Sequence, residues 1–415
     1  MNAGSTSSHD ARLDALAQVA IKVGVRIARG QELVMTAPLE AVPLARRITE
    51  HAYRAGAALV TVIYSDEQTV LTRFAHAPDE SFDRSTPWLF DGLAAAFRNG
   101  AGRLGVVGND PSLLARQDPD KVARANRAQS AAYRPALELI TDFAINWTLV
   151  PCATPAWGRA VFPDLAPEAA VDRLWDAIFS AARVDGADPF AEWQAHNASL
   201  RARTEFLNAR RYAALRFHGP GTDLTVGLAD GHAWCGGEAP AKNGTVCNPN
   251  IPTEEVFTTP HRDRVDGTVV STKPLSYMGS LIRDIRVRFD GGRIVEANAS
   301  SGEEVLRKVL ETDEGARRLG EVALVPYSSP ISRSGLLFFN TLFDENAASH
   351  IALGQAYSEC FVDRGRLSKD DLASCGANQS LIHIDWMIGS SQVDVDGLPA
   401  DGRAEPLMRG GDWIS

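Results

Sequence analysis

The first half of the chain alternates between helical and extended hydrophobic spacing. Apolar residues recur every three to four positions over residues 13–23 and 42–52, which predicts two amphipathic helices. Residues 32–36 and 58–64 are apolar runs typical of strands, and the unbroken second run predicts a strand buried on both faces. The order strand, helix, strand is a βαβ unit, so we expect a parallel sheet.

The same alternation continues up to residue 211. Residues 104–107 and 145–150 are predicted strands, and Asp110-Pro111 is predicted to cap the next helix. Helical spacing dominates from Pro167 to Arg211. No Gly-x-Gly-x-x-Gly or Walker loop follows any of these strands, so this part lacks the usual phosphate-binding turn.

The pattern changes after Tyr212 to short alternating runs separated by hairpin signals. Asp-Gly or Asn-Gly pairs begin at residues 230, 243, 266 and 290, and the last joins two strands over 285–289 and 293–295. We therefore expect an N-terminal α/β domain with a parallel sheet over residues 1–210. A C-terminal α+β domain with a mostly antiparallel sheet is expected over residues 211–415.

Composition narrows the class of protein. The 415 residues suffice for two domains with separate cores, and the formal net charge of −10 argues against nucleic acid or an anionic membrane as a partner. No signal peptide is evident, and the longest apolar runs are too short to cross a bilayer. The five cysteines are scattered, odd in number and without a CxxC pair, which is typical of reduced thiols in a cytoplasmic protein.

Clusters of histidine and acidic residues, the types that commonly bind metals, lie in the second half of the chain. His383 and Asp385 alternate with Ile382, Ile384 and Trp386, so an extended strand would place the imidazole and the carboxylate on one side. The other places are Glu254-Glu255 before an apolar run, Glu321 at the start of a predicted strand, and Glu345 with His350, which opens a run of helical character over 350–354.

Together these places provide four carboxylates and two imidazoles, about the number that two divalent ions need when one carboxylate bridges them. Two ions roughly 3.5–4 Å apart can share one hydroxide, polarise a carbonyl and stabilise the resulting oxyanion. The mixed ligands suit zinc, cobalt, manganese or magnesium. Covalent catalysis is a weaker hypothesis, because no Gly-x-Ser-x-Gly elbow is present and no cysteine has a histidine partner in sequence.

These residues resemble the M29 metallopeptidases, the thermophilic-type aminopeptidases, over nearly the whole chain. The first-half resemblance depends on the helix near 13–23 and the run 57–66. In the second half it depends on Pro-Thr-Glu-Glu-Val-Phe-Thr at 252–258, Asp-Gly-Thr-Val at 266–269, Gly-Glu-Val-Ala at 320–323, Glu-Asn-Ala at 345–347 with His350, Ala-Leu-Gly at 352–354 and Ile-His-Ile-Asp at 382–385.

The resemblance implies a dinuclear aminopeptidase that removes the N-terminal residue from unblocked peptides. It implies the metal ligands Glu255, Glu321, Glu345, His350, His383 and Asp385, with Tyr357 beside the ions. It also implies a homodimer with the catalytic site in the C-terminal domain.

Within that expectation, we assign three roles. Glu321 is the bridging carboxylate, Glu255 or Glu254 transfers the proton of the attacking water, and Tyr357 donates a hydrogen bond to the oxyanion.

Two alternatives use the same scaffold. His350, His383 and Asp385 could form the facial triad of a mononuclear Fe(II) oxygenase, although this would leave the three glutamates without a role. A non-catalytic binding protein that keeps the fold is the third hypothesis, which the intact ligand set disfavours.

Overall fold

The computed structural model of the chain describes residues 8–277, 280–362, 366–401 and 403–414. Its contacts divide the chain into two compact units, of which the first is Met1–His196 with Glu238–Pro252 and the second is Asn197–Gly237 with Thr253–Ser415. Residues Glu238–Pro252 thus belong to the first unit, although the second unit begins before them in sequence. The domain boundary at residue 210 stays a prediction.

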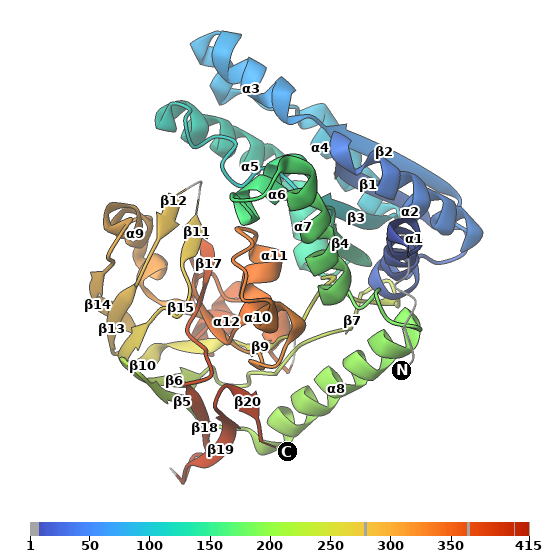
Figure 1. Cartoon of the computed structure of the whole chain (residues 1–415). Coiled ribbons are helices and arrows are strands. Elements are labelled where there is room, and N and C mark those ends of the chain that lie inside the picture. The colour runs from blue at the N-terminus through green and yellow to red at the C-terminus, as the bar shows by residue number, and fades with distance from the viewer. Residues whose placement is uncertain (1–7, 278–279, 363–365, 402, 415) are drawn as a thin grey trace. The chain divides into compact units, whose positions relative to one another are not determined.

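The first unit contains the parallel sheet that the βαβ pattern predicts, with the strand order β2-β1-β3-β4 (Figure 1). Its strands are β1 (Glu32–Pro38), β2 (Leu59–Ser65), β3 (Gly102–Val107) and β4 (Trp147–Pro151). The helices of this part of the chain are α1 (His9–Val19), α2 (Val42–Arg54), α3 (Glu67–His76), α4 (Pro87–Arg98), α5 (Pro119–Thr141), α6 (Pro155–Val161), α7 (Pro167–Ala181) and α8 (Pro189–Arg210), which extends past residue 196.

Two details of this unit differ from the sequence prediction. Strand β2 is not buried on both faces, because it is the edge strand and Leu59 is 49% exposed. Asp110 does not cap the next helix, since residues 111–116 form a turn and α5 begins at Pro119 with Asp118 as its N-cap. Both errors concern the position of a segment relative to its neighbours rather than its apolar pattern.

The second unit consists mainly of two antiparallel sheets. In the larger sheet the strand order is β14-β13-β10-β6-β5-β18-β19-β20. Its strands are β5 (Ala214–Gly219), β6 (Thr222–Leu228), β10 (Pro260–Val270), β13 (Arg286–Asp290), β14 (Arg293–Asn298), β18 (Asp394–Leu398), β19 (Glu405–Arg409) and β20 (Asp412–Trp413). The predicted hairpin over 285–295 is confirmed as β13 and β14.

The smaller sheet has the order β17-β16-β15-β9, and all of its neighbouring strands are antiparallel. Its strands are β9 (Val256–Thr258), β15 (Leu319–Leu324), β16 (His350–Gly354) and β17 (His383–Met387). The short helices of this unit are α9 (Glu303–Leu310), α10 (Pro330–Ser334), α11 (Thr341–Asp344) and α12 (Lys369–Ser374), with the 3₁₀ turns η4 (Glu314–Arg317), η5 (Glu345–Ala347) and η6 (Ser358–Cys360).

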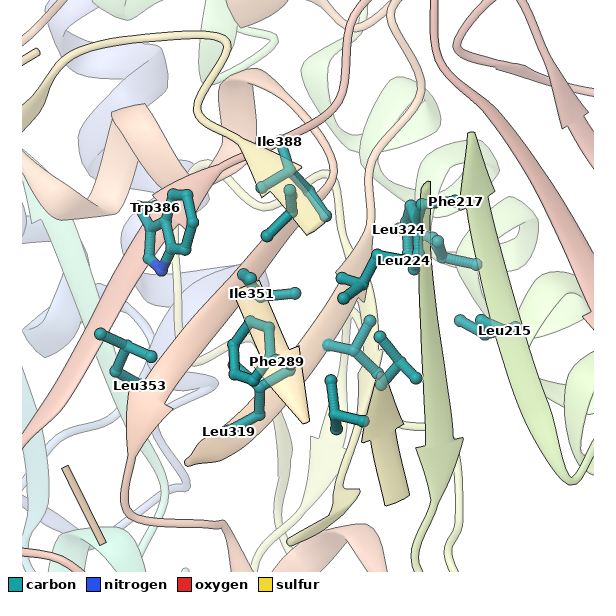
Figure 2. Close-up of a cluster of buried hydrophobic side chains, with 14 of the residues drawn as sticks. Leu215, Phe217, Leu224, Phe289, Leu319, Leu324, Ile351, Leu353, Trp386 and Ile388 are labelled. Atoms are coloured by element: carbon teal, nitrogen blue, oxygen red, sulfur yellow. The ribbon is translucent and has the colours of Figure 1, made fainter. Parts of the chain in front are cut away.

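One hydrophobic core joins the two sheets of the second unit. Figure 2 shows side chains from both sheets in this cluster, including Leu215, Phe217, Leu224, Phe289, Leu319, Leu324, Ile351, Leu353, Trp386 and Ile388. One face of the smaller sheet is therefore committed to the core, and its other face is available for polar chemistry. Among the residues that the structure describes, none of the helices has the length and apolarity needed to pass through a bilayer.

Candidate metal centre

The smaller sheet places three of the predicted site residues in two adjacent rows. Antiparallel pairing aligns Glu321 with Ala352 and Ala352 with Asp385, and it aligns His350 with Ala323 one row away on the same face. Residues opposite each other on neighbouring strands have Cβ atoms about 4.5–5.5 Å apart, so Glu321 and Asp385 lie about twice that distance apart, on either side of Ala352. The ladder alone therefore brings side chains from distant parts of the sequence within reach of one ion.

The opposite face of the same strands is apolar. Val322, Ile351 and Trp386 form one row there, and all three are almost completely buried in the core between the sheets. Ile384 lies on this face too, so β17 alternates as its sequence predicts, with His383 and Asp385 on the other side. Burial of the apolar row holds the acidic and imidazole row in register.

A bulge at Gly320 sets the face of Glu321. Leu319 pairs with Leu353 and Glu321 with Ala352, so β15 has one residue more than β16 at this point. Leu319 consequently joins the core, whereas Glu321, two positions later, lies on the polar face. A Cβ at position 320 would lie 2.3 Å from the carbonyl oxygen of Gln355, so only glycine fits at the bulge.

The segment that begins at His350 is a strand, and the predicted helical character is wrong. All five residues of β16 are buried, because β15 and β17 flank the strand and both of its faces are covered. A strand buried on both faces has no polar alternation, so its apolar run cannot be told from a helix by spacing alone.

The six predicted ligands form two overlapping groups with one further carboxylate beside them. Glu255, Glu321 and His350 have ligand atoms within 4.8 Å of one another, and so do Glu321, His383 and Asp385. Only Glu321 belongs to both groups. Glu345, in the turn before β16, lies close enough to interact electrostatically with Glu255 and Asp385 but is in neither group.

Short contacts centre on the two imidazoles. His350 Nε2 lies 3.2 Å from Glu255 Oε2 and 3.3 Å from Glu321 Oε1. His383 Nε2 lies 3.3 Å from Asp385 Oδ1 and 3.6 Å from Glu321 Oε2. The two oxygens of Glu321 thus face different histidines, which is the arrangement that a bridging carboxylate requires.

The tautomers of both histidines leave Nε2 available as a ligand. His350 Nδ1 lies 3.1 Å from the carbonyl oxygen of Ala348, and His383 Nδ1 lies 2.8 Å from that of Gln355. Because a carbonyl can only accept, Nδ1 carries a proton in each ring, and a bound cation would take the place of any proton on Nε2. A ring N–H that donates to a carbonyl is the usual support for a metal-bound imidazole.

Several buried ligand atoms have no hydrogen-bond partner. These are His350 Nε2, Glu255 Oε2 and Asp385 Oδ1, which approach other site atoms without hydrogen-bond geometry. Buried polar atoms in proteins are nearly always paired, so unpaired atoms within both ligand groups fit bound cations. The residues present therefore fit the divalent metal that the carboxylate and imidazole donors suggest.

The charge of the cluster also fits a cation. Burial raises the pKa of Glu321 to about 7, helped by the carboxylates of Glu255 and Asp385, and burial raises the pKa of Glu345 well above its usual value. Burial lowers the pKa of His383, but Asp385 and Glu321 outweigh it and raise the pKa to about 9. These shifts show a strongly negative local potential, which protons or metal ions neutralise.

Tyr357 lies directly against the site. Its ring centroid is 4.6 Å from that of His383, and burial together with Glu321 and Asp385 raises the pKa of its hydroxyl well above the usual value. The hydroxyl therefore stays protonated and can donate a hydrogen bond at neutral pH.

Ala352 is a site residue that the sequence did not reveal as functional. It stands between Glu321 and Asp385 in one row of the ladder and is fully buried. Its methyl group leaves room between the two carboxylates, which a larger side chain would fill. Only the pairing register could have identified it, because a small residue in an apolar run has no distinctive signal.

Fold and site together define a class of protein in which an antiparallel sheet presents a carboxylate and imidazole cluster for divalent metal. The chain belongs to the M29 family, described as "Thermophilic metalloprotease (M29)", whose sequence profile matches residues 9–413. The family membership and the metallopeptidase class inferred from sequence are thus confirmed.

The relatives of this chain are similar over their full lengths. It is 56% identical to "Aminopeptidase T" from Thermus thermophilus over 97% of this chain and 98% of that protein. It is 45% identical to "Aminopeptidase 2" from Geobacillus stearothermophilus over 97% of each chain. The solved structure "Wild-type AmpT from Thermus thermophilus" matches with a TM-score of 0.94 at 54% identity, over 98% of this chain and 100% of that one.

Proposed function

We propose that the protein is a dinuclear metallo-aminopeptidase that removes the N-terminal residue from unblocked peptides. The observation that supports this most is the pair of ligand groups joined by Glu321, whose two oxygens face different histidines. When bound there, two divalent ions supply a Lewis acid for the scissile carbonyl and an activated water as nucleophile. Full-length similarity to proteins named aminopeptidases supports the peptide substrate.

Each of the two ligand groups would hold one ion. Glu255 and His350 would hold one ion and His383 and Asp385 the other, with Glu321 shared. Glu345 would add a ligand from the turn before β16. Zinc, cobalt, manganese and magnesium all suit these donors.

Proton transfer is assigned to Glu255. Its carboxylate contacts His350 in the cluster, so one of its oxygens can take a proton from the attacking water and pass it to the leaving amine. The sequence did not distinguish it from Glu254. The contact with His350 favours Glu255, and the comparison of the two Gln variants tests the choice. We expect Glu255→Gln to lose turnover and the ion on the His350 side, whereas Glu254→Gln keeps both ions. Full metal binding and low turnover in Glu254→Gln would move the proton-transfer role to Glu254.

Tyr357 is assigned to the oxyanion that develops on the substrate carbonyl. A protonated phenol beside the metal cluster can donate there, and losing one such donor typically costs about 10²–10³-fold in kcat. Tyr357→Phe should lower kcat by this order while metal content and KM stay near those of the unmodified chain. A normal kcat would assign Tyr357 to packing only.

The mononuclear Fe(II) hypothesis fits the geometry poorly. Its triad of His350, His383 and Asp385 is divided between the two groups, which share only Glu321. The three glutamates that this hypothesis leaves without a role are all part of the same cluster.

The remaining expectations complete the proposal. We infer a homodimer, a cytoplasmic location and a catalytic role for residues 211–415, with residues 1–210 as a separate N-terminal domain. Light scattering would test the homodimer, cell fractionation the location, and the activity of residues 211–415 alone the catalytic role.

Metal counting combined with hydrolysis of leucine p-nitroanilide tests the central proposal. We expect about two ions per chain by elemental analysis, loss of activity on chelation, and recovery on adding back divalent metal. One ion per chain with full peptidase activity would refute the dinuclear site alone. Two ions without hydrolysis of any unblocked peptide would refute the activity.

A further inference from the structure

The side chain of Asn346 connects the two segments that hold Glu255 and Glu345. It is completely buried, and its Oδ1 accepts a hydrogen bond from the backbone N–H of Glu254 at 2.6 Å. Its Nδ2 donates to the carbonyl oxygen of Leu342 at 3.0 Å. One amide thus fastens the segment before β9 to the helical turn before β16.

The position of this hydrogen bond makes it relevant to the metal cluster. Residues 251–255 lie outside the strands, so the ladder of the smaller sheet fixes Glu255 only from its C-terminal side, where Val256 pairs with Leu324. The bond from Glu254 N–H is one residue from Glu255, whose carboxylate must stay beside His350. By contrast, Glu321, His350, His383 and Asp385 all stand on paired strands.

The surroundings of Asn346 make its geometry rigid. Its backbone carbonyl accepts from the Ser329 hydroxyl at 3.4 Å, and Nδ2 also lies 3.5 Å from Glu345 Oε1. A buried amide with these partners has little freedom to rotate, because turning it would leave buried donors and acceptors unpaired.

We propose that Asn346 is a positioning residue that holds Glu255 in place for the ion on the His350 side. The inference depends on the proposed function for the existence of that ion, and it adds a residue that acts through Glu255 rather than on substrate. Loss of an outer partner of a metal ligand typically weakens metal binding about 10–100-fold. Asn346→Ala should therefore weaken binding of one ion by this factor and leave the Glu321, His383 and Asp385 group intact.

A thermodynamic cycle in the full-length protein distinguishes positioning from general loosening. Zn²⁺ affinity is measured by competition with a chelator for Asn346→Ala in three backgrounds: the unmodified chain, Asp385→Asn and Glu255→Gln. We expect the 10–100-fold loss in the first two backgrounds. In Glu255→Gln, Asn346→Ala should change affinity by no more than about twofold, because the ligand that it positions is already lost.

Asn340→Asp serves as the matched control. Asn340 begins the same helical turn and its side chain caps α11 by accepting from Leu342 N–H, a role that aspartate retains. This variant should keep the Zn²⁺ affinity of the unmodified chain.

Two results would overturn the inference. One is an equal loss of Zn²⁺ affinity in the Glu255→Gln background, which would indicate general loosening. The other is a crystal structure of Asn346→Ala in which Glu255 Oε2 remains as close to His350 Nε2 as before. If the unmodified chain binds a single ion, the dinuclear proposal fails, but the same cycle on that ion still decides the role of Asn346.

Discussion

In the described part of the chain, acidic side chains lie near one another at both four-stranded sheets, and only the antiparallel sheet groups them with imidazoles as candidate metal ligands. Beyond the strands of the parallel sheet, Glu67 at the start of α3 accepts a hydrogen bond from Asp110 N–H, and burial followed by nearby carboxylates raises the pKa of Glu67. On the antiparallel sheet, burial raises the pKa of Glu321 to about 7. Among the described residues, groups of three ligand atoms are found only around Glu321.

The difference lies in what holds the acids. Glu67 is on a helix that follows a half-exposed edge strand, where water can solvate its charge. Glu321 is 4% exposed, on a strand paired on both sides, and faces two imidazoles. Clustered acids alone are therefore poor evidence for a metal site, whereas acids and imidazoles fixed by one ladder are good evidence.

The largest expected effect on turnover comes from replacing a carboxylate of the antiparallel sheet, with a carboxylate beside the parallel sheet as the control. Glu321→Gln should lower turnover by about 10³-fold or more, since it removes the shared ligand and one full charge from the cluster. The matched variant Glu67→Gln should change turnover and metal content by less than about twofold. Elemental analysis and peptide hydrolysis measure both. Full activity in Glu321→Gln would remove Glu321 from the mechanism, and a loss in Glu67→Gln would contradict the contrast between the sheets.

A leucine from each sheet tests how firmly the strands are held. Leu324→Ala, on the fully buried β15, should lower the free energy of unfolding by about 2–5 kcal/mol. Leu59→Ala, on the half-exposed edge strand β2, should cost within about 0.5 kcal/mol. Urea unfolding gives both values. Similar costs for the two variants would show that the edge strand is buried in solution.

The space between the carboxylates can be tested with adjacent residues on opposite faces of β16. Ala352→Leu should weaken metal binding about 10–100-fold, because the added side chain fills the row between Glu321 and Asp385. Ile351→Val, on the core face, should cost about 0.5–1.5 kcal/mol of stability and leave metal affinity unchanged. Chelator competition and urea unfolding separate the two effects. Unchanged metal affinity in Ala352→Leu would mean that the ions do not occupy this row.

The smallest expected effect is a pH dependence of stability at the loop before β17. Burial would raise the pKa of Asp313, but hydrogen bonds from Leu381 N–H, Ser380 and Ala316 N–H lower it below the usual value. The stabilisation is therefore present above the unfolded pKa near 3.8 and is lost as pH falls through the lower folded value.

Asp313→Asn serves to measure this contribution. Above about pH 5 the variant should be less stable by about 1 kcal/mol, and the difference should shrink toward pH 3. Thermal unfolding of both proteins from pH 3 to 6 measures it. A difference that grows on acidification would mean that the carboxyl group is more stabilising when protonated.

Much of the organisation could be predicted from the sequence because its patterns are local. The alternation in β17, the hairpin of β13 and β14, and the βαβ pattern each depend on neighbouring residues, and the structure confirms them. The M29 resemblance added the set of candidate ligands, which alternation alone could not select.

The parts that could not be predicted depend on the partners of a segment. The run that begins at His350 has no alternation because both faces of β16 are covered, and the exposure of β2 follows from its edge position. Ala352 and Asn346 have ordinary side chains, and their surroundings become visible only when strands and turns far apart in sequence are aligned.

Because Gly320 is an extra residue in β15, the number of residues in this strand decides on which face of the sheet Glu321 lies. If Val322 were deleted while Ala323 kept its pairing with His350, Glu321 would take the place of Val322 and turn toward the apolar interior. We conclude that insertions and deletions along this strand are a greater threat to the protein's chemistry than most single substitutions.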